Sequence, residues 1–407
     1  MRILLSEGSG LTSRQVATRL GELGHEVEVL SSTPVCLARF TRHVRALHHV
    51  PRFGDDPFAW CEAAGRIARR RGADLLFPTQ EQVTILAARQ HSLGVATIVP
   101  DFAALRRVQD KLTAWHTLDE IGTPQPPTVL VARPEDLARV TSFPAYVKRP
   151  IGTASMGVRR VTTRAELEAA ARGFGLGDGE LMVQTEVAGP LAMVQAVADR
   201  GRLVAHHANL RLRLGVGGGA ALKESVAIAG LHDILARLVA GLSWHGALSL
   251  DVIVTAQGPL VIDVNPRLVE PANALAAGVD LVGAMLDLAR GAAPAEQPPG
   301  RAGVRTHQTL LAVLGAAEHD GKRLAILSET CDATRARGAY ANSREELTPL
   351  QGDPIAAIPV AIALLLSLIH PRLWQVFHLK AAGTYAVSPQ AWQAIVAEAE
   401  RDAILPR

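Results

Sequence analysis

Hydrophobic and polar positions alternate most clearly in two runs of the chain, residues 248–254 and 260–265. An aliphatic residue at every second position is typical of a β-strand with one buried face. The sequence Gln257-Gly258-Pro259 between the runs is a turn signal, so we predict a β-hairpin with a three- or five-residue loop. The loop length fixes which residues of the two strands face each other.

The predicted register brings two acidic side chains together. With Val254 opposite Leu260, the other facing pairs are Val252 with Ile262, Leu250 with Val264, Ser249 with Asn265, and Asp251 with Asp263. Directly opposed residues have Cβ atoms about 4.5–5.5 Å apart, and like charges at this separation destabilise the strand pair. The two carboxylates and the neighbouring carboxamide therefore need a cation.

The donor set of Asp251, Asp263 and Asn265 indicates which cation. Three oxygen donors suit Mg²⁺ or Mn²⁺ better than Zn²⁺, and Mg²⁺ commonly arrives with nucleotide phosphates. Arg267, two residues after Asn265, adds a planar guanidinium that suits a phosphate or a carboxylate. The alternative is a solvated hairpin face with a chance pair of acids.

The first third of the chain alternates strand-like and helix-like patterns. Residues 2–5 form a short aliphatic run, residues 11–23 have helical periodicity, and residues 25–30 alternate again. This order predicts a βαβ unit and therefore a parallel, doubly wound α/β layer. Glu81 follows the strand-like run 73–78, at the edge where such sheets bind ligands. It either faces a substrate or caps a helix.

Two further stretches have residues suited to phosphate binding. Lys148 lies in the strand-like run 143–150 and precedes the small-residue loop 151–158. Backbone N–H groups of such a loop can approach a polyphosphate closely, and the lysine supplies a positive charge. Lys111 lies in a helical run that ends in the proline-rich sequence 122–128.

A third strand-like run ends in the glycine-rich loop 215–219. Arg211 and Arg213 precede this loop and share one face of a strand, which suits an acyl phosphate or a carboxylate. A solvated edge strand is the alternative. His206 and His207 are adjacent and point to opposite faces, so they do not favour a shared zinc ion.

The order of these signals resembles the ATP-grasp superfamily, and Val261 to Arg267 resembles its acid-x-Asn-x-Arg pattern, with Asp263 where Glu is more usual. The resemblance covers about residues 1–290. It implies that Asp251, Asp263 and Asn265 hold Mg²⁺ or Mn²⁺, and that Lys111 and Lys148 bind the ATP phosphates. It also implies that Gly152, Thr153, Ser155 and Gly157 belong to a flap over the phosphates, and that backbone groups of Gln184, Thr185, Glu186 and Val187 hydrogen-bond the adenine.

The ribose contact and the catalytic arginines of this predicted site need separate comment. Many relatives carry an acid for the ribose just beyond the equivalent of Gly189, whereas this chain continues with Pro190-Leu191-Ala192. Glu186 is therefore the candidate for the ribose contact. The resemblance also implies catalytic arginines beside the transferring phosphoryl group, and the candidates are Arg267, Arg211 and Arg213.

The implied fold is α/β, with an α+β nucleotide-binding part. A Rossmann-like domain is expected in residues 1–105, the ATP-grasp domain in 106–295, and a C-terminal extension in 296–407. The implied activity joins a small carboxylate, such as an amino acid, to an amine through an acyl phosphate, with release of ADP. A homodimer is compatible with this class. The alternatives are a biotin carboxylase-like or carbamoyl-phosphate synthase-like enzyme that forms carboxyphosphate, and an ATP-binding regulator without turnover.

Composition places the protein in a broad class. A chain of 407 residues with 48% hydrophobic residues is globular and long enough for two or three domains. The formal net charge of +3 is too small to indicate nucleic acid. Three scattered cysteines and an N-terminal apolar run too short for a signal peptide favour the cytoplasm. The apolar run 355–369 is shorter than the about 20 residues of a membrane span, and it predicts a buried helix ended by Pro371.

Overall fold

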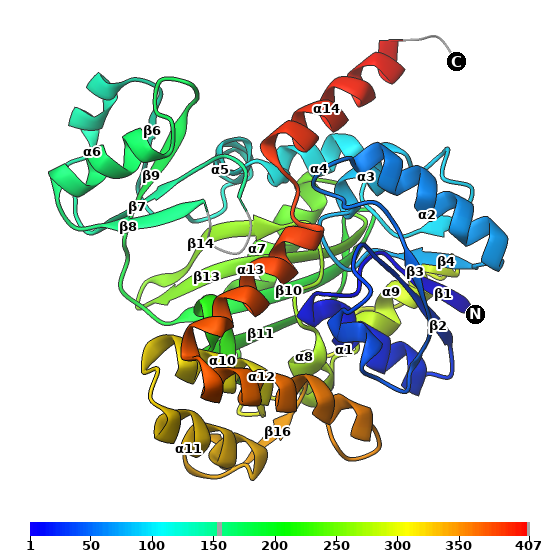
Figure 1. The fold of residues 1–407 in the computed structure, drawn as a ribbon. Coiled ribbons are helices and arrows are strands. Elements are labelled where there is room, and N and C mark those ends of the chain that lie inside the picture. The colour runs from blue at the N-terminus through cyan, green and yellow to red at the C-terminus, as the bar shows by residue number, and fades with distance from the viewer. Residues whose placement is uncertain (153–156, 405–407) are drawn as a thin grey trace.

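The computed structural model describes residues 1–152 and 157–404, and these form three β-sheets flanked by helices (Figure 1). The N-terminal sheet lies on the right of Figure 1, a small lobe with its own sheet lies at the upper left, and the largest sheet lies in the centre. This mixed arrangement agrees with the α/β class predicted from the sequence.

The N-terminal layer is a parallel sheet with strand order β3-β2-β1-β4-β5. Its elements are β1 (Arg2–Leu5), α1 (Leu11–Glu22), β2 (Glu26–Ser31), β3 (Val44–His49), α2 (Pro57–Arg71), β4 (Leu75–Phe77), α3 (Val83–Ala88) and β5 (Ala96–Thr97). Because β1 pairs in parallel with both β2 and β4, the chain order reverses between β1 and β4. Open α/β sheets bind ligands at the carboxyl ends of the strands beside such a reversal.

The small lobe is an antiparallel sheet with strand order β6-β9-β7-β8. Its elements are β6 (Thr128–Val131), β7 (Ala145–Lys148), β8 (Val158–Val161), α6 (Arg164–Gly173) and β9 (Leu181–Thr185). Val147, Leu167 and Val183 are buried in a core that belongs to this lobe. The lobe therefore has its own packing and presents β7 and β9 to the rest of the molecule.

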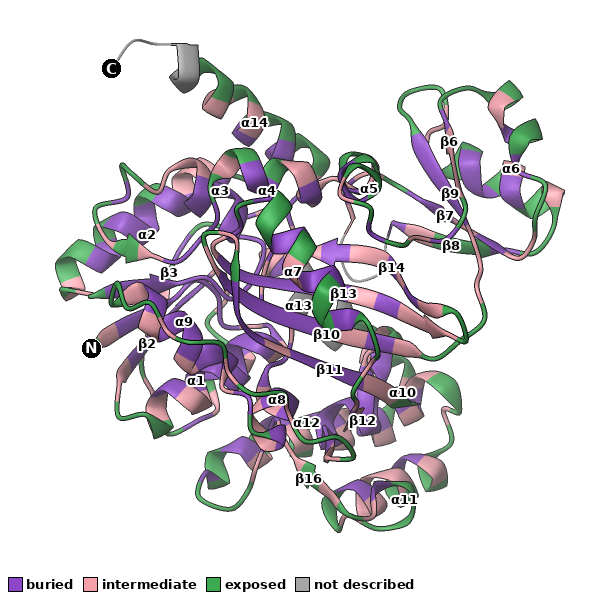
Figure 2. Ribbon diagram, turned by 180° about the vertical axis from the view of Figure 1, so that it is seen from behind, coloured by how far each residue is buried: buried purple, intermediate pink, exposed green. Residues whose placement is uncertain are grey.

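The central sheet has strand order β14-β13-β10-β11-β12-β15-β16. Its strands are β10 (Leu191–Asp199), β11 (Arg202–Leu214), β12 (Ala220–Ser225), β13 (Gly246–Thr255), β14 (Gly258–Asn265), β15 (Arg305–His307) and β16 (Ser343–Glu345). Figure 2 shows that β10, β13 and the first part of β11 are mostly buried, because helices cover both faces. The nearby helices are α4 (Phe102–Gln109), α5 (Lys111–Glu120), α7 (Leu231–Gly241), α8 (Ala272–Ala277) and α9 (Leu281–Ala289).

The central hairpin follows the predicted register only at its inner end. The predicted pairs of Ser249 with Asn265, Leu250 with Val264 and Asp251 with Asp263 are confirmed. The predicted loop length and the outer pairs are wrong, because the turn is shorter and the register shifts after Asp251. The outer pairs are Val252 with Val261, Ile253 with Leu260, Val254 with Pro259 and Thr255 with Gly258. Ile262 is the extra residue of a β-bulge.

The C-terminal residues complete the central sheet and cover the N-terminal layer. The helices are α10 (Thr309–His319), α11 (Arg323–Thr334), α12 (Ala357–Ile369), α13 (Trp374–Tyr385) and α14 (Pro389–Ile404). β15 pairs with β12, and Trp392 and Ile395 of α14 are buried in the core of the N-terminal layer. The domain limits at residues 105 and 295 remain a prediction.

Helix α12 is less buried than predicted. It ends at Ile369, before Pro371, as expected. However, Pro359 and Ala363 are buried whereas Ile358 and Leu365 are exposed, so the prediction of a buried helix is wrong. The helix is apolar on all sides, and its sequence therefore gives no signal of which side packs. None of the helices in the described residues is long and apolar enough to cross a membrane.

A buried ion pair ties the C-terminal segment to the first helix. Arg14 of α1 is fully buried, and its Nη2 lies 2.8 Å from Oδ2 of Asp353. Asp353 also accepts a hydrogen bond from the Thr41 hydroxyl at 2.6 Å and one from the Arg42 N–H at 3.1 Å. Burial lowers the pKa of Arg14, and Asp353 opposes this shift.

We predict that Asp353→Ala lowers the free energy of unfolding by about 3–5 kcal/mol, because it leaves the Arg14 charge buried without its carboxylate. Chemical denaturation measures the change. The control is Glu62→Ala, which removes an ion pair with Arg66 whose side chains are 63% and 64% exposed. That variant should lose less than about 1 kcal/mol. Equal losses in the two variants would contradict the prediction.

Candidate active site

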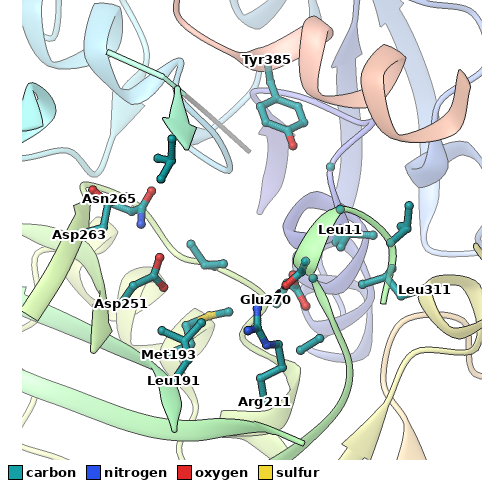
Figure 3. Close-up of a pocket in the computed structure, with 18 of the residues that line it drawn as sticks. Leu11, Leu191, Met193, Arg211, Asp251, Asp263, Asn265, Glu270, Leu311 and Tyr385 are labelled. Atoms are coloured by element: carbon teal, nitrogen blue, oxygen red, sulfur yellow. Dashed lines mark hydrogen bonds between the residues drawn. The ribbon is translucent and has the colours of Figure 1, made fainter. Parts of the chain in front are cut away.

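A cavity of about 1270 Å³ is lined by residues from the small-lobe sheet, the central sheet, the segments that follow β1 and β2, and the C-terminal helices (Figure 3). Small-molecule pockets usually have about 300–1,000 Å³, so the cavity has room for a nucleotide and a second substrate. The predicted site residues that line it are Lys111, Lys148, Gly152, Gln184, Thr185, Glu186, Val187, Arg211, Asp251, Asp263, Asn265 and Arg267.

The predicted flap is only partly described. Thr153 and Ser155 lie outside the described residues. Gly152 and Gly157 pack against each other at the base of the loop, where a Cβ on Gly152 would lie 3.0 Å from the Gly157 Cα. This close approach of two backbone segments requires glycine. Gly157 is not part of the cavity lining, and its role in a flap remains a prediction.

The hairpin brings its oxygen donors to the cavity as the register predicted. Asp251 and Asp263 are directly paired on neighbouring strands, and Asn265 follows on the same side of β14 (Figure 3). Burial and the neighbouring Asp263 carboxylate raise the pKa of Asp251 to about 6. A raised pKa of this origin marks a place where negative charge lacks enough compensation.

The donor chemistry of this group fits Mg²⁺. No cluster of three or more His, Cys, Asp or Glu side chains suited to a metal occurs in the described residues. Two carboxylates and one carboxamide are hard oxygen donors, and this is the kind of partial shell that Mg²⁺ completes with phosphates and water. Asp251, Asp263 and Asn265 are therefore the residues suited to hold the ion.

Lys111 supplies a positive charge to the acidic pair. Its Nζ lies 2.7 Å from Oδ1 of Asp263. Burial acts to lower the pKa of Lys111, but Asp263 and Asp251 outweigh it and the pKa is raised. The Asp110 side chain accepts from the N–H groups of Leu112 and Thr113, and this cap fixes the start of α5 where Lys111 lies. The resemblance assigned Lys111 to the phosphates, and that role remains a prediction.

Lys148 is held by the bulge in β14. Its Nζ donates to the Ile262 carbonyl at 2.7 Å and to Gln184 Oε1 at 2.7 Å. Burial is the main cause that lowers the pKa of Lys148, to about 8, and Lys111 contributes. The bulge that the sequence did not predict thus turns a backbone carbonyl toward the lysine. Lys148 lines the cavity beside the acidic hairpin.

One part of the cavity lies between the small lobe and the central sheet. Its apolar walls come from the small lobe and the central sheet, and they were not identified from the sequence. The residues are Tyr146, Val158, Leu191, Met193, Ile253 and Ile262. The N–H groups of Thr185 and Glu186 already donate to Pro127 and Pro144, whereas the Val187 N–H has no acceptor among the described residues.

Glu186 is partly engaged in another interaction. Its carboxylate pairs with Arg160 at 2.5 Å, and the hydrogen bonds from Arg160 are the main cause that lowers the pKa of Glu186. The carboxylate lines the cavity nevertheless. A ribose contact by Glu186 remains a prediction.

Arg267 and Arg213 have different surroundings from each other. The Arg267 side chain is 11% exposed, lines the cavity and lies 3.9 Å from Glu81. Its buried Nε has no hydrogen-bond partner among the described residues. Arg213 is not part of the cavity lining, because two register shifts in β11 turn it toward Glu329, with which it pairs at 2.5 Å. The structure therefore does not bring Arg213 to the cavity.

Arg211 remains a candidate. It lines the cavity, and its Nη1 donates to the Gly218 carbonyl at 2.6 Å. Burial lowers the pKa of Arg211, and the Asp251 carboxylate is the main influence that opposes this shift. No carboxylate of the described residues forms a salt bridge with it, so its remaining donors can bind an anion.

Glu270 is a cavity residue that the sequence did not indicate. Its Oε2 accepts from Lys223 and Gln308, and Lys223 also pairs with Glu346 at 2.6 Å. Burial acts to lower the pKa of Lys223, but the two glutamates outweigh it and the pKa is raised. Glu270 has a φ of 55°, which is uncommon for a residue other than glycine and is enriched at functional sites.

No protein-family model and no curated protein matches the sequence. Solved structures do match. Biotin carboxylase from Campylobacter jejuni, in complex with β,γ-ATP, is 19% identical with a TM-score of 0.60, over 75% of this chain and 74% of that one. N5-carboxyaminoimidazole ribonucleotide synthetase from Thermus thermophilus is 22% identical with a TM-score of 0.58, over 75% and 81%.

A third match is the biotin carboxylase domain dimer of 2-oxoglutarate carboxylase from Hydrogenobacter thermophilus, in complex with MgADP, ADP and bicarbonate. It is 18% identical with a TM-score of 0.58, over 75% of this chain and 73% of that one. At these identities the matches show the fold. The chain has the ATP-grasp fold, as the resemblance predicted.

We predict that affinity for ATP falls by about tenfold from about pH 7 to about pH 9, because Lys148 loses its charge as pH rises through a pKa of about 8. Binding of a non-hydrolysable ATP analogue at saturating Mg²⁺ measures this. Lys148→Arg is the control, since a guanidinium stays charged throughout and the dependence should shrink to less than about twofold. An equal pH dependence in the two proteins would contradict the prediction.

Proposed function

We propose that the protein is an ATP-dependent ligase that joins a small carboxylate, such as an amino acid, to an amine. The observation that carries this proposal is the set of Asp251, Asp263 and Asn265 beside Lys111 and Lys148 in one cavity. These groups fit a magnesium-bound triphosphate. The cavity volume leaves space for a second substrate.

The proposed chemistry has two steps. An oxygen of the carboxylate attacks the γ-phosphorus of ATP, the bond from this phosphorus to the bridging oxygen breaks, and ADP leaves. The nitrogen of the amine then attacks the acyl carbon, the bond to the phosphate oxygen breaks, and phosphate leaves while the nitrogen loses a proton. The product is an amide.

The side chains serve these steps mainly by position and charge. Lys148 binds phosphoryl oxygens, and Arg267 and Arg211 hold the carboxylate and the transferring group. Lys111, paired with Asp263, supplies further positive charge. When bound, Mg²⁺ neutralises phosphate charge as a Lewis acid. The Val187 N–H is the proposed donor to the adenine, and Tyr146 and Met193 belong to its apolar walls.

A second candidate is an enzyme that forms carboxyphosphate from bicarbonate. It is favoured by the structural likeness to biotin carboxylase and N5-carboxyaminoimidazole ribonucleotide synthetase, including the complex with MgADP and bicarbonate. The chemistry of the first step is the same, with bicarbonate as the carboxylate. The carboxylate, the acceptor and the product distinguish the two candidates.

We predict that ADP and phosphate are released from Mg-ATP only when a carboxylate and an amine are both present. The experiment offers amino acids and small carboxylic acids in pairs and identifies products by mass spectrometry. A product with the summed mass minus water supports the ligase. Release that depends on bicarbonate favours the second candidate, and release of AMP contradicts both candidates.

We predict that Asp263→Ala lowers Mg²⁺-dependent turnover by roughly 100-fold or more, because it removes a ligand whose ion contributes several kcal/mol to the transition state. The control is Asp233→Ala, which changes a carboxylate that is 77% exposed. Circular dichroism checks that the two variants keep the native fold. Retention of more than half of the turnover by Asp263→Ala would contradict the metal assignment.

A further inference from the structure

The two ends of the cavity differ in chemistry. The metal end contains Asp251, Asp263 and Asn265, and Arg211 and Glu270 lie between it and the end with Leu11 and Leu311, as Figure 3 shows. The far end is apolar. The residues that line it include Leu11, Leu37, Val216, Leu310, Leu311 and Leu314.

The far end is built by segments distant in the sequence. Leu11 begins α1, residues 33–40 follow β2, and α10, α12 and α13 complete the wall. Leu11 and Leu37 pack against the same hydrophobic cluster as α10 and α12. A charged group placed against such a wall would lose its hydration without gaining a partner, whereas an apolar group would be stabilised.

Lys223 lies next to both Arg211 and Glu270. Arg211 and Lys223 are directly paired on β11 and β12, and Lys223 binds Oε2 of Glu270. Gln308 anchors the same oxygen, and Oε1 of Glu270 accepts no hydrogen bond from the described residues. The site thus offers one guanidinium and one free carboxylate oxygen at the entrance of the apolar end.

Contacts of the backbone place Glu270 beside the apolar wall. Its N–H donates to the Thr12 hydroxyl at 3.1 Å, next to Leu11. Glycines fix the other side of the entrance, since a Cβ on Gly215 would lie 2.8 Å from the Leu311 Cβ. The loop that holds the Arg211 side chain through Gly218 therefore packs directly on α10.

We propose that the cavity binds an amino acid with an uncharged, apolar side chain. Its carboxylate lies at Arg211, its ammonium lies at Oε1 of Glu270, and its side chain occupies the apolar end formed with α10, α12 and α13. This inference rests on the proposed function and names the substrate class of that site. In this proposal the C-terminal helices select the substrate.

The test measures binding by calorimetry on the full chain, with Mg²⁺ and a non-hydrolysable ATP analogue present. L-leucine or L-phenylalanine should bind at least about tenfold more tightly than L-aspartate, L-asparagine and L-lysine. Leucine should also bind at least about tenfold more tightly than 4-methylpentanoate, which lacks the ammonium group.

Two substitutions on α12 provide a matched comparison. Ile362 lines the cavity and Ile358, one turn earlier, does not, although their exposed fractions are 41% and 43%. Ile362→Lys should weaken binding of leucine by at least about tenfold and favour L-aspartate over it, whereas Ile358→Lys should leave binding unchanged. Circular dichroism confirms that both variants are folded.

Tighter binding of charged amino acids by the native protein, or no binding of any apolar amino acid, would overturn the inference. Equal effects of the two lysine substitutions would also overturn it. Turnover is a separate measurement. Binding of leucine without ADP release in any pair would count against the ligase and leave the inference in place. ADP release only with charged substrates would overturn the inference and leave the ligase in place.

Discussion

Electrostatic repulsion between two carboxylates is the constraint on which the cavity depends. Asp251 and Asp263 are directly paired across the central hairpin and partly buried, and the pKa of Asp251 is raised to about 6. Such a pair is stable only with cations around it. Lys111 of α5, which precedes the small lobe in the sequence, contacts this pair. Lys148 of β7, within the small lobe, lies beside it. One repulsive contact thus fixes where three separate parts of the chain must converge.

The sequence alone predicted this constraint because it is local. Alternation along two neighbouring strands determines which side chains face each other, and no distant contact disturbs the ladder between Ser249 and Asp251. The parallel N-terminal layer was predictable for the same reason. The bulge at Ile262 was not, because its residue is as hydrophobic as its neighbours and its carbonyl is used by Lys148, a partner more than a hundred positions away.

Residues whose roles depend on distant partners were not predictable. Arg211 and Arg213 look equivalent in sequence, and only the register shifts in β11 and the presence of Glu329 separate them. Glu270 has no local signal, since its position depends on Lys223 and Gln308. The packed side of α12 could not be identified either, because a helix with apolar residues on all sides has no distinct hydrophobic face.

The C-terminal segment is integrated into the fold in a way that limits how such a protein can evolve. β15 extends the central sheet, Asp353 neutralises Arg14 inside α1, and α14 fills the core of the N-terminal layer. This segment cannot be exchanged as a module, because its removal would expose a sheet edge and leave a buried charge unpaired. New substrate specificity would therefore have to arise by single substitutions within this segment, because exchange of the whole segment would destabilise the fold.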